Sequence, residues 1–118
     1  KFRQALIQGI TQEVEDRALR KAKDPIIFEG SMEWPVLMLG PAASRVCNNS
    51  KKPVFLYSKR DKDSQGAVRT PKDVDGVKAM MHCAKFLRTY GGHAQAAGFR
   101  IDNENIEAFK DCLIEYFG

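Results

Sequence analysis

The sequence is poor in the residues that build metal centres and covalent cross-links. It contains two histidines and three cysteines, with no CxxC pair and no cluster of cysteine and histidine. Cys47, Cys83 and Cys112 are far apart in the sequence, so neither a zinc site nor a framework of disulfides is expected. The odd number of cysteines favours buried thiols in a reducing compartment, which predicts a cytoplasmic protein.

Long apolar runs, repeats and linkers are also missing. No run approaches the roughly 20 residues of a membrane span, so no membrane partner is expected. The first 17 residues, KFRQALIQGITQEVEDR, are charged throughout and do not resemble a signal peptide. The chain does not start with methionine, so we expect it to be a piece of a longer protein. Its 118 residues fit one domain with a modest core.

The charge balance is mildly basic. The net charge is +4, the isoelectric point is about 9.1, and 43% of the residues are hydrophobic. Such a surface favours polyanionic partners, but the charge alone does not indicate nucleic-acid binding.

Hydrophobic periodicity predicts alternating helices and strands. Helices are expected over 2–23 and 75–88 and from Asn103 onward, and strands over 26–30, 53–58, 66–70 and 97–101. Residues 34–39 fit a strand, in which case Gly40 and Pro41 would begin a helix that runs to about Asn49. The strands at 53–58 and 66–70 would form a hairpin. The pattern predicts an α/β fold with a mixed sheet and a hairpin, flanked by helices and preceded by a connector helix.

The first helix carries an apolar residue at every fourth position, namely Phe2, Leu6, Ile10 and Val14. This stripe should pack on the rest of the domain or on a neighbour outside the chain.

The stretch YGGHAQAAGFR, residues 90–100, allows two interpretations. Gly91 and Gly92 would end the preceding helix and expose backbone N–H groups that can form an anion-binding nest, beside which His93 adds a donor. The small residues that follow leave room for a phosphate. Alternatively, the stretch is a helix stop followed by a tightly packed strand, with His93 bonded to a nearby carbonyl.

Several motifs carry a resemblance to a known family. GGHAQAAGF resembles the GGH-xx-AAG signature of the DHH-associated domain in the DHH phosphoesterases, and most resembles the branch of the RecJ-like single-strand exonucleases. WPVLMLGPAASRV is similar to the W-xx-G-V-I-G-xx-A-S-R-L segment of that branch, and GAVRT to its G-S-x-R-S segment. KKPVFLYS and NIEAFKDCL resemble a strand and the closing helix of the same domain. The sequence departs from the pattern at Leu37, which replaces a glycine, and at Ala67, which replaces a serine.

The resemblance implies that two domains of the parent protein have different roles. A DHH domain would hold two Mn²⁺ or Mg²⁺ ions and activate a water, while this domain would close the cleft and bind the phosphate of single-stranded DNA. Residues 1–24 would then be a connector helix from a missing N-terminal DHH domain, and residues 25–118 the substrate-binding domain. The implied phosphate-binding residues are Arg69, Gly91, Gly92, His93, Arg45 and Thr70. His93 would assist at the cleft of the parent enzyme, and no metal ligand or catalytic residue is expected within the chain itself.

Alternatives remain for the function and for single residues. The chain by itself is expected to be inactive, and its parent could be a 5′ to 3′ exonuclease of DNA repair and recombination. The parent could also be an inactive RecJ-like interaction module, or a nano-RNA or cyclic-dinucleotide phosphodiesterase. Arg69 could pair with a carboxylate, and Arg45 could form an ordinary surface pair. His82 is expected to be an exposed helical residue.

Overall fold

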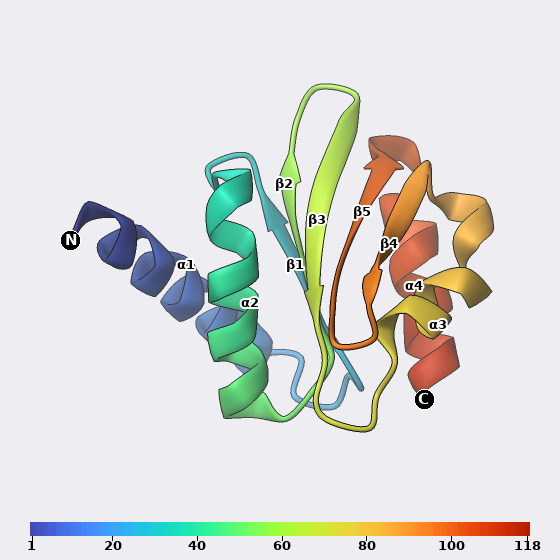
Figure 1. Cartoon of the computed structure of the whole chain (residues 1–118), viewed down its shortest axis with the longest axis horizontal. Helices are drawn as coiled ribbons and strands as arrows, with labels where there is room; N and C mark the ends of the chain where they lie inside the picture. Colours follow the sequence, from blue (N-terminus) through green and yellow to red (C-terminus); the bar gives the residue numbers. More distant parts are fainter.

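Five strands form one mixed sheet in the order β1-β2-β3-β5-β4 (Figure 1). The computed structural model covers residues 1–118, and its strands are β1 (Ile27–Ser31), β2 (Val54–Lys59), β3 (Asp63–Arg69), β4 (Thr89–His93) and β5 (Ala96–Asp102). β1 is parallel to β2, and all other neighbours are antiparallel. The predicted α/β fold, the mixed sheet and the β2–β3 hairpin are therefore confirmed.

Helices cover both faces of the sheet, which gives three layers (Figure 1). α1 (Phe2–Leu19) and α2 (Val36–Ser50) lie on one face, and α3 (Gly76–His82) and α4 (Ile106–Phe117) on the other. Two short 3₁₀ turns, η1 (Ala84–Phe86) and η2 (Asn103–Asn105), follow α3 and precede α4. None of these helices combines the length and the apolar character that crossing a membrane requires.

The sheet separates two hydrophobic cores, because successive strand residues point to opposite faces. On β2, Val54 and Leu56 face the α1–α2 layer, whereas Phe55 between them faces the α3–α4 layer. Phe55 and Phe99 meet Phe109 of α4 in the second core, with ring centroids 6.1 and 5.2 Å from that of Phe109. Because both faces of β2 are covered, its sequence is a continuous run rich in β-branched and aromatic residues, and this run is the signal from which the strand was predicted.

Helix α1 belongs to this domain over most of its length. Ile7, Ile10 and Val14 are buried against α2, whereas Phe2 is 79% exposed and the first turn projects from the body (Figure 1). The buried positions are three and four residues apart, as a helix in contact along one face requires. Packing within this domain is therefore confirmed for Ile10 and Val14, and for Phe2 the expected contact with a neighbour outside the chain stays a prediction.

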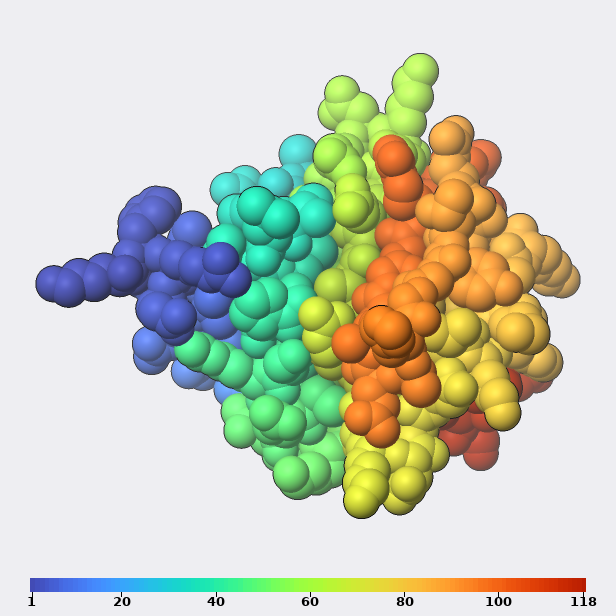
Figure 2. Space-filling view, viewed as in Figure 1, coloured from blue at the N-terminus to red at the C-terminus, as the bar shows by residue number.

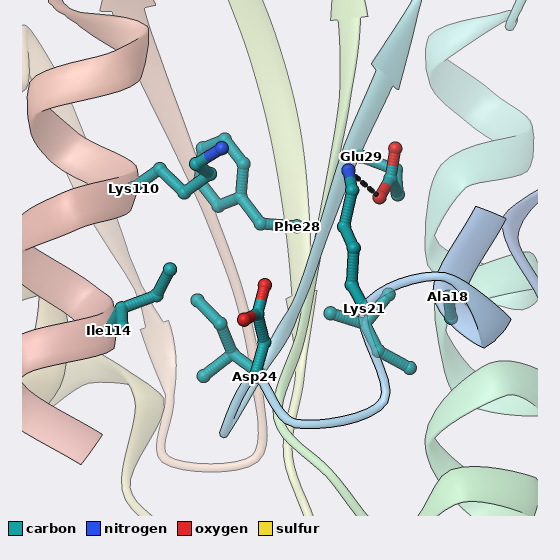
Figure 3. A pocket seen from close by; sticks show the side chains of 9 residues that line it. Ala18, Lys21, Asp24, Phe28, Glu29, Lys110 and Ile114 are labelled. Atoms are coloured by element: carbon teal, nitrogen blue, oxygen red, sulfur yellow. Dashed lines mark hydrogen bonds and ion pairs between the residues drawn. The ribbon is translucent and has the colours of Figure 1, made fainter. Parts of the chain in front are cut away.

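The end of α1 is held to β1 by charged side chains. The Glu29 carboxylate is buried, and Lys21 Nζ lies 2.8 Å from one of its oxygens (Figure 3). Arg17 lies 3.4 Å from the other oxygen and donates a hydrogen bond of 3.0 Å to the carbonyl of Gly30. A buried carboxylate requires such partners, since its desolvation is costly. The small cavity between this segment and α4 has room for about one water molecule.

Helix α2 begins at Val36, so the strand considered for residues 34–39 is wrong. Leu39, Ala42, Ala43 and Val46 are all buried, and their spacing of three and four residues brings them onto one helical face. Pro41 lies inside the helix, and the helix ends with Lys51 in the left-handed conformation at φ 62°. Burial of this face therefore outweighed the local signal of Gly40 and Pro41.

The region expected to be one helix over 75–88 is shorter. Asp75 caps α3 as predicted, with a bond of 3.0 Å from the amide of Lys78, but α3 ends at His82. The sulfurs of Cys83 and Cys112 form a disulfide, with the two Cα atoms 6.0 Å apart. The expectation of three free thiols was wrong, because α3 and α4 pack side by side on the sheet although their cysteines are 29 residues apart. Only Cys47 is free, and it is buried.

The start of the last helix also differs from the prediction. Asn103 begins η2, and its side chain donates a hydrogen bond of 2.6 Å to the carbonyl of Arg60 and accepts one from Ser64. Asn103 therefore holds the β2–β3 hairpin instead of capping α4, which starts at Ile106.

Candidate phosphate-binding site

Helix α2 covers only part of its face of the sheet. It packs on β2 and β3, and the neighbouring strands β5 and β4 extend beyond it. In the space-filling view, the β4–β5 hairpin (orange) lies on the open surface beside α2 (Figure 2). Along β5, Ala97, Phe99 and Ile101 are buried toward α3 and α4. The alternate residues Ala96, Gly98 and Arg100 therefore lie on the uncovered face.

Arg69 and His93 lie in one row across this open face. Arg69 of β3 is opposite Ala96 of β5, and Ala96 is opposite His93 of β4. Directly paired residues of antiparallel strands point to the same side, so both side chains lie on the same face with a methyl group between them. Their backbones are separated by two strand spacings, about 10 Å. The reach of both side chains therefore allows them to contact one phosphate from opposite sides.

The guanidinium of Arg69 is a half-buried cation without an acidic partner. Its Nη1 donates a hydrogen bond of 2.8 Å to the carbonyl of Val68, and no carboxylate lies within ion-pair distance. Burial lowers the pKa of Arg69, although arginine stays charged in proteins. A partly desolvated charge without a counter-ion is unfavourable unless an anion compensates it. The alternative of an Arg69–carboxylate pair is therefore wrong, and the side chain remains available for an anion.

Gly91 and Gly92 do not form the expected loop. They belong to strand β4 at the edge of the sheet, where Gly91 pairs with Gly98 and Gly92 with Ala97. Gly92 has φ +128°, and a Cβ there would lie 2.7 Å from the Cα of Ala97. A side chain at this position would separate β4 from β5. Gly92 thus allows close strand pairing. A Cβ on Gly91 would meet no atom within 4 Å, and Gly91, two residues before His93 on the same face, leaves the surface beside His93 without side-chain bulk.

The side chains of Thr70 and Arg45 bond to other partners and do not join the row formed by Arg69 and His93. Thr70 is buried, and its hydroxyl donates toward the carbonyls of Val74 and Ala94, at 2.7 and 3.3 Å. Arg45 donates a hydrogen bond of 2.7 Å to the side chain of Gln4 on α1. Because it lies five residues after Gly40, it is turned about 140° around α2 from the face that Arg69 contacts. The structure therefore brings Arg69, His93 and the glycines together, and directs Arg45 toward α1.

One α2 residue beside Arg69, Gly40, was missed from the sequence. A Cβ on Gly40 would lie 2.5 Å from Nη2 of Arg69, so the guanidinium lies directly on the helix backbone. Ser44 is one helical turn further along the same side of α2. A signal for the open face was nevertheless present: three small residues, Ala96, Ala97 and Gly98, follow one another at the start of β5.

The acidic residues and histidines of the chain do not come together. No group of three or more histidine, cysteine, aspartate or glutamate side chains is arranged to hold a metal ion. His82 is exposed at the end of α3, as predicted, with its ring 5.1 Å from that of Tyr116. The side chains present thus do not fit a divalent metal.

The fold and this surface define a class of protein: a small α/β domain that presents an uncompensated arginine and a histidine on the open part of a mixed sheet. The DHHA1 domain family matches residues 7–118. The chain therefore belongs to the DHHA1 domain family.

Known relatives agree with this assignment. The single-stranded-DNA-specific exonuclease RecJ of Thermus thermophilus is 31% identical over 108 residues, which cover 92% of this chain and 15% of that protein. Crystal structures of that RecJ with Mn²⁺ and with Mg²⁺ superpose with TM-scores of 0.85 and 0.82, at 29% identity. Each match covers 97% of this chain, and 17% and 18% of the respective RecJ chains. The chain thus spans less than a fifth of the length of this relative.

A more distant likeness concerns the fold alone. The C-Ala domain of alanyl-tRNA synthetase from Aquifex aeolicus superposes with a TM-score of 0.57 at 18% identity, covering 77% of this chain and 94% of that domain. The same arrangement of helices and strands therefore also occurs in a domain of a different enzyme.

Proposed function

We infer that this chain is the substrate-binding domain of a RecJ-like exonuclease, and that it binds a phosphate of single-stranded DNA between Arg69 and His93. The observation that carries this inference is the half-buried, uncompensated guanidinium of Arg69 in one row with His93. The likeness to RecJ supports it. The proposed substrate class is consistent with the net charge of +4.

In this proposal the two side chains have different roles. The planar guanidinium of Arg69 can donate two parallel hydrogen bonds to a phosphate, and its partly buried position strengthens the contact. His93 donates from the opposite side, and Gly92 lets β4 pair closely with β5. Hydrolysis would be carried out by a DHH domain with two Mn²⁺ or Mg²⁺ ions, in a 5′ to 3′ exonuclease of DNA repair and recombination in the cytoplasm. This chain would close the cleft and orient the phosphate.

The test is substitution of Arg69 and His93 in the intact enzyme. A charge-assisted contact contributes about 1.5–3 kcal/mol, so Arg69→Ala and His93→Ala should each slow the cleavage of single strands on the order of ten- to a hundredfold. Arg69→Lys should restore only part of the activity, because an ammonium group lacks the planar fork. The double variant should lose less than the product of the single losses, since both groups act on one phosphate.

A matched control removes the same charge elsewhere. Arg20 is exposed at the end of α1 and forms no ion pair, so Arg20→Ala should leave cleavage unchanged. Each variant should retain the free energy of unfolding of the wild type within about 1 kcal/mol, since these residues lie outside the core. Full activity of a folded Arg69→Ala enzyme would contradict the proposal.

A further inference from the structure

The turn that follows His93 is fastened to the loop that follows Arg69. The carbonyl of Ala94 accepts a hydrogen bond of 2.7 Å from the amide of Gly76, and the hydroxyl of Thr70 lies 3.3 Å from the same oxygen. The amide of Thr70 donates to the carbonyl of Gln95 at 3.2 Å. The β4–β5 turn is therefore held by three hydrogen bonds, from Thr70 just after β3 and from Gly76 at the start of α3.

The hydroxyl of Thr70 also shapes the loop that makes these contacts. It donates to the carbonyl of Val74 at 2.7 Å, which closes residues 70–74 into a compact loop just before α3. Gly76 fits beside it without a side chain, because a Cβ there would lie 3.3 Å from the oxygen of Ala94 and 3.2 Å from Cγ2 of Thr70. We refer to Thr70, Gly76 and the carbonyls of Ala94 and Gln95 as the turn clip.

Strand β4 needs an external support of this kind. It is an edge strand, paired only with β5, and two of its five residues are glycines. Glycine restricts the backbone least of all residues, so the strand that carries His93 has little stiffness of its own. The turn clip begins one residue after Arg69 and reaches the turn directly after His93, so it connects the ends of the two strands that carry these side chains.

We propose that Thr70 is a positioning residue: its hydroxyl sets the place of His93 opposite Arg69 and does not itself contact the phosphate. The single hydroxyl proton is directed to backbone carbonyls, and the side chain is buried, so no donor is left for an anion. This inference rests on the proposed function, because it assigns Thr70 a role in the same phosphate-binding site.

Two substitutions at Thr70 separate the hydroxyl from the shape of the side chain. Thr70→Ser keeps the hydroxyl, whereas Thr70→Val keeps the shape and removes it. A neutral hydrogen bond contributes about 0.5–1.5 kcal/mol, so Thr70→Val should weaken binding of a 5′-phosphorylated oligothymidine to this chain by roughly two- to tenfold. Thr70→Ser should bind within about twofold of the wild type. The dissociation constants are measured by NMR titration well below the melting temperature, so that all variants stay folded.

The NMR spectra also give a readout that a loss of stability alone would not change. In Thr70→Val, the imidazole signals of His93 and its nuclear Overhauser contacts to Ala96 should change, and those of His82 should not. The amide of Gly76 should exchange faster, because the clip has loosened. If Thr70→Val does not fold, Gly76→Ala replaces it: this variant crowds the Ala94 carbonyl while it keeps the hydroxyl, and it should weaken binding in the same way.

The outcomes distinguish this inference from the proposed function. If Arg69→Ala binds as tightly as the wild type, the proposed phosphate site itself is wrong. If Arg69→Ala weakens binding but Thr70→Val does not, the site stands and the positioning role of Thr70 is overturned. If Thr70→Ser loses as much affinity as Thr70→Val, the hydroxyl is not the cause, which also overturns it.

Discussion

At the scale of single residues, the position of the Arg69 guanidinium depends on a glycine inside α2. Gly40 costs α2 up to about 1 kcal/mol relative to alanine, yet a Cβ at this position would lie 2.5 Å from Nη2 of Arg69. The guanidinium can therefore occupy its position only because the helix backbone is bare there. Gly40 thus lowers the intrinsic stability of α2, but it leaves the space in which the Arg69 guanidinium lies, and the proposed site depends on that position.

Gly40→Ala should separate stability from binding. The methyl group displaces the end of the Arg69 side chain, which is flexible, so the free energy of unfolding should stay the same or rise by up to about 1 kcal/mol. The displaced guanidinium should contact the phosphate less well. If this contact loses about 1 kcal/mol of its free energy, a 5′-phosphorylated single strand should bind about fivefold more weakly. Urea unfolding and a fluorescence titration measure the two quantities.

Gly9→Ala is the matched control for this substitution. Gly9 lies in α1, and apart from the nearby backbone of the helix itself no atom lies within 4 Å of the place that an added methyl group would take, so the change should stabilise the helix and leave binding unaltered. Equal affinities of the Gly40→Ala variant and the wild type would show that phosphate binding does not require Arg69 to lie against Gly40.

At the scale of elements, the Cys83–Cys112 disulfide joins α3 to α4 on the face of the sheet opposite α2. α3 is also the element that leads from the turn clip into η1 and β4, so the cross-link fixes the far end of the same segment. A disulfide stabilises a fold mainly by restricting the unfolded chain, and for a separation of 29 residues the effect is about 3–4 kcal/mol.

Reduction should therefore lower the stability markedly. We expect a reductant, or the double change Cys83→Ser and Cys112→Ser, to lower the free energy of unfolding by about 3–4 kcal/mol in urea. Cys47→Ala should leave this sensitivity to reductant intact, since Cys47 is the free cysteine.

Thiol counting tests the cross-link directly. Burial raises the pKa of the Cys47 thiol, so it stays protonated and should react slowly with an alkylating reagent in the folded chain. In denaturant one thiol should be labelled before reduction and all three afterwards. Three labelled thiols in denaturant without reductant would show that the disulfide is absent.

At the scale of the whole molecule, binding to single strands should be weak and only moderately sensitive to salt. Several cations are already paired within the chain, as Arg88 is with Asp102 and Arg100 with Asp63, and the net charge is only +4. Few positive charges are therefore left to neutralise phosphates. The proposed site binds one phosphate through Arg69 and His93, with at most a neighbouring phosphate in reach.

The expected slope of log K against log salt is about −0.7 to −1.4, which corresponds to one or two phosphates of a single strand. Titrations of a fluorescent oligothymidine at several salt concentrations measure it, and Arg69→Ala should make the slope shallower by about 0.7. Nanomolar affinity that does not depend on salt would instead indicate recognition by base stacking.

Much of the fold could be predicted because its signals are local. The β-branched and aromatic residues of Val54–Lys59, the cap at Asp75 and the spacing of Ile106, Phe109 and Leu113 each depend on a few neighbouring residues. The start of α2 could not be predicted in this way. Whether residues 36–39 form a strand or a helix turn depends on the partner that buries Leu39, which lies elsewhere in the chain.

The candidate site shows the same division. By itself, the sequence determined the α/β class and the β2–β3 hairpin, and its resemblance to the DHH-associated domain predicted Arg69 and His93 as the residues that bind a phosphate. Only the tertiary structure decided that these two share a row of the sheet, that Gly91 and Gly92 form an edge strand, and that Arg45 turns toward α1. The pairing of Cys83 with Cys112 and the place of the Thr70 hydroxyl were decided there too. The physical reason is that helical and strand periodicity are properties of adjacent residues, whereas strand register, a disulfide and a hydrogen bond across a turn join residues that only the folded chain brings together.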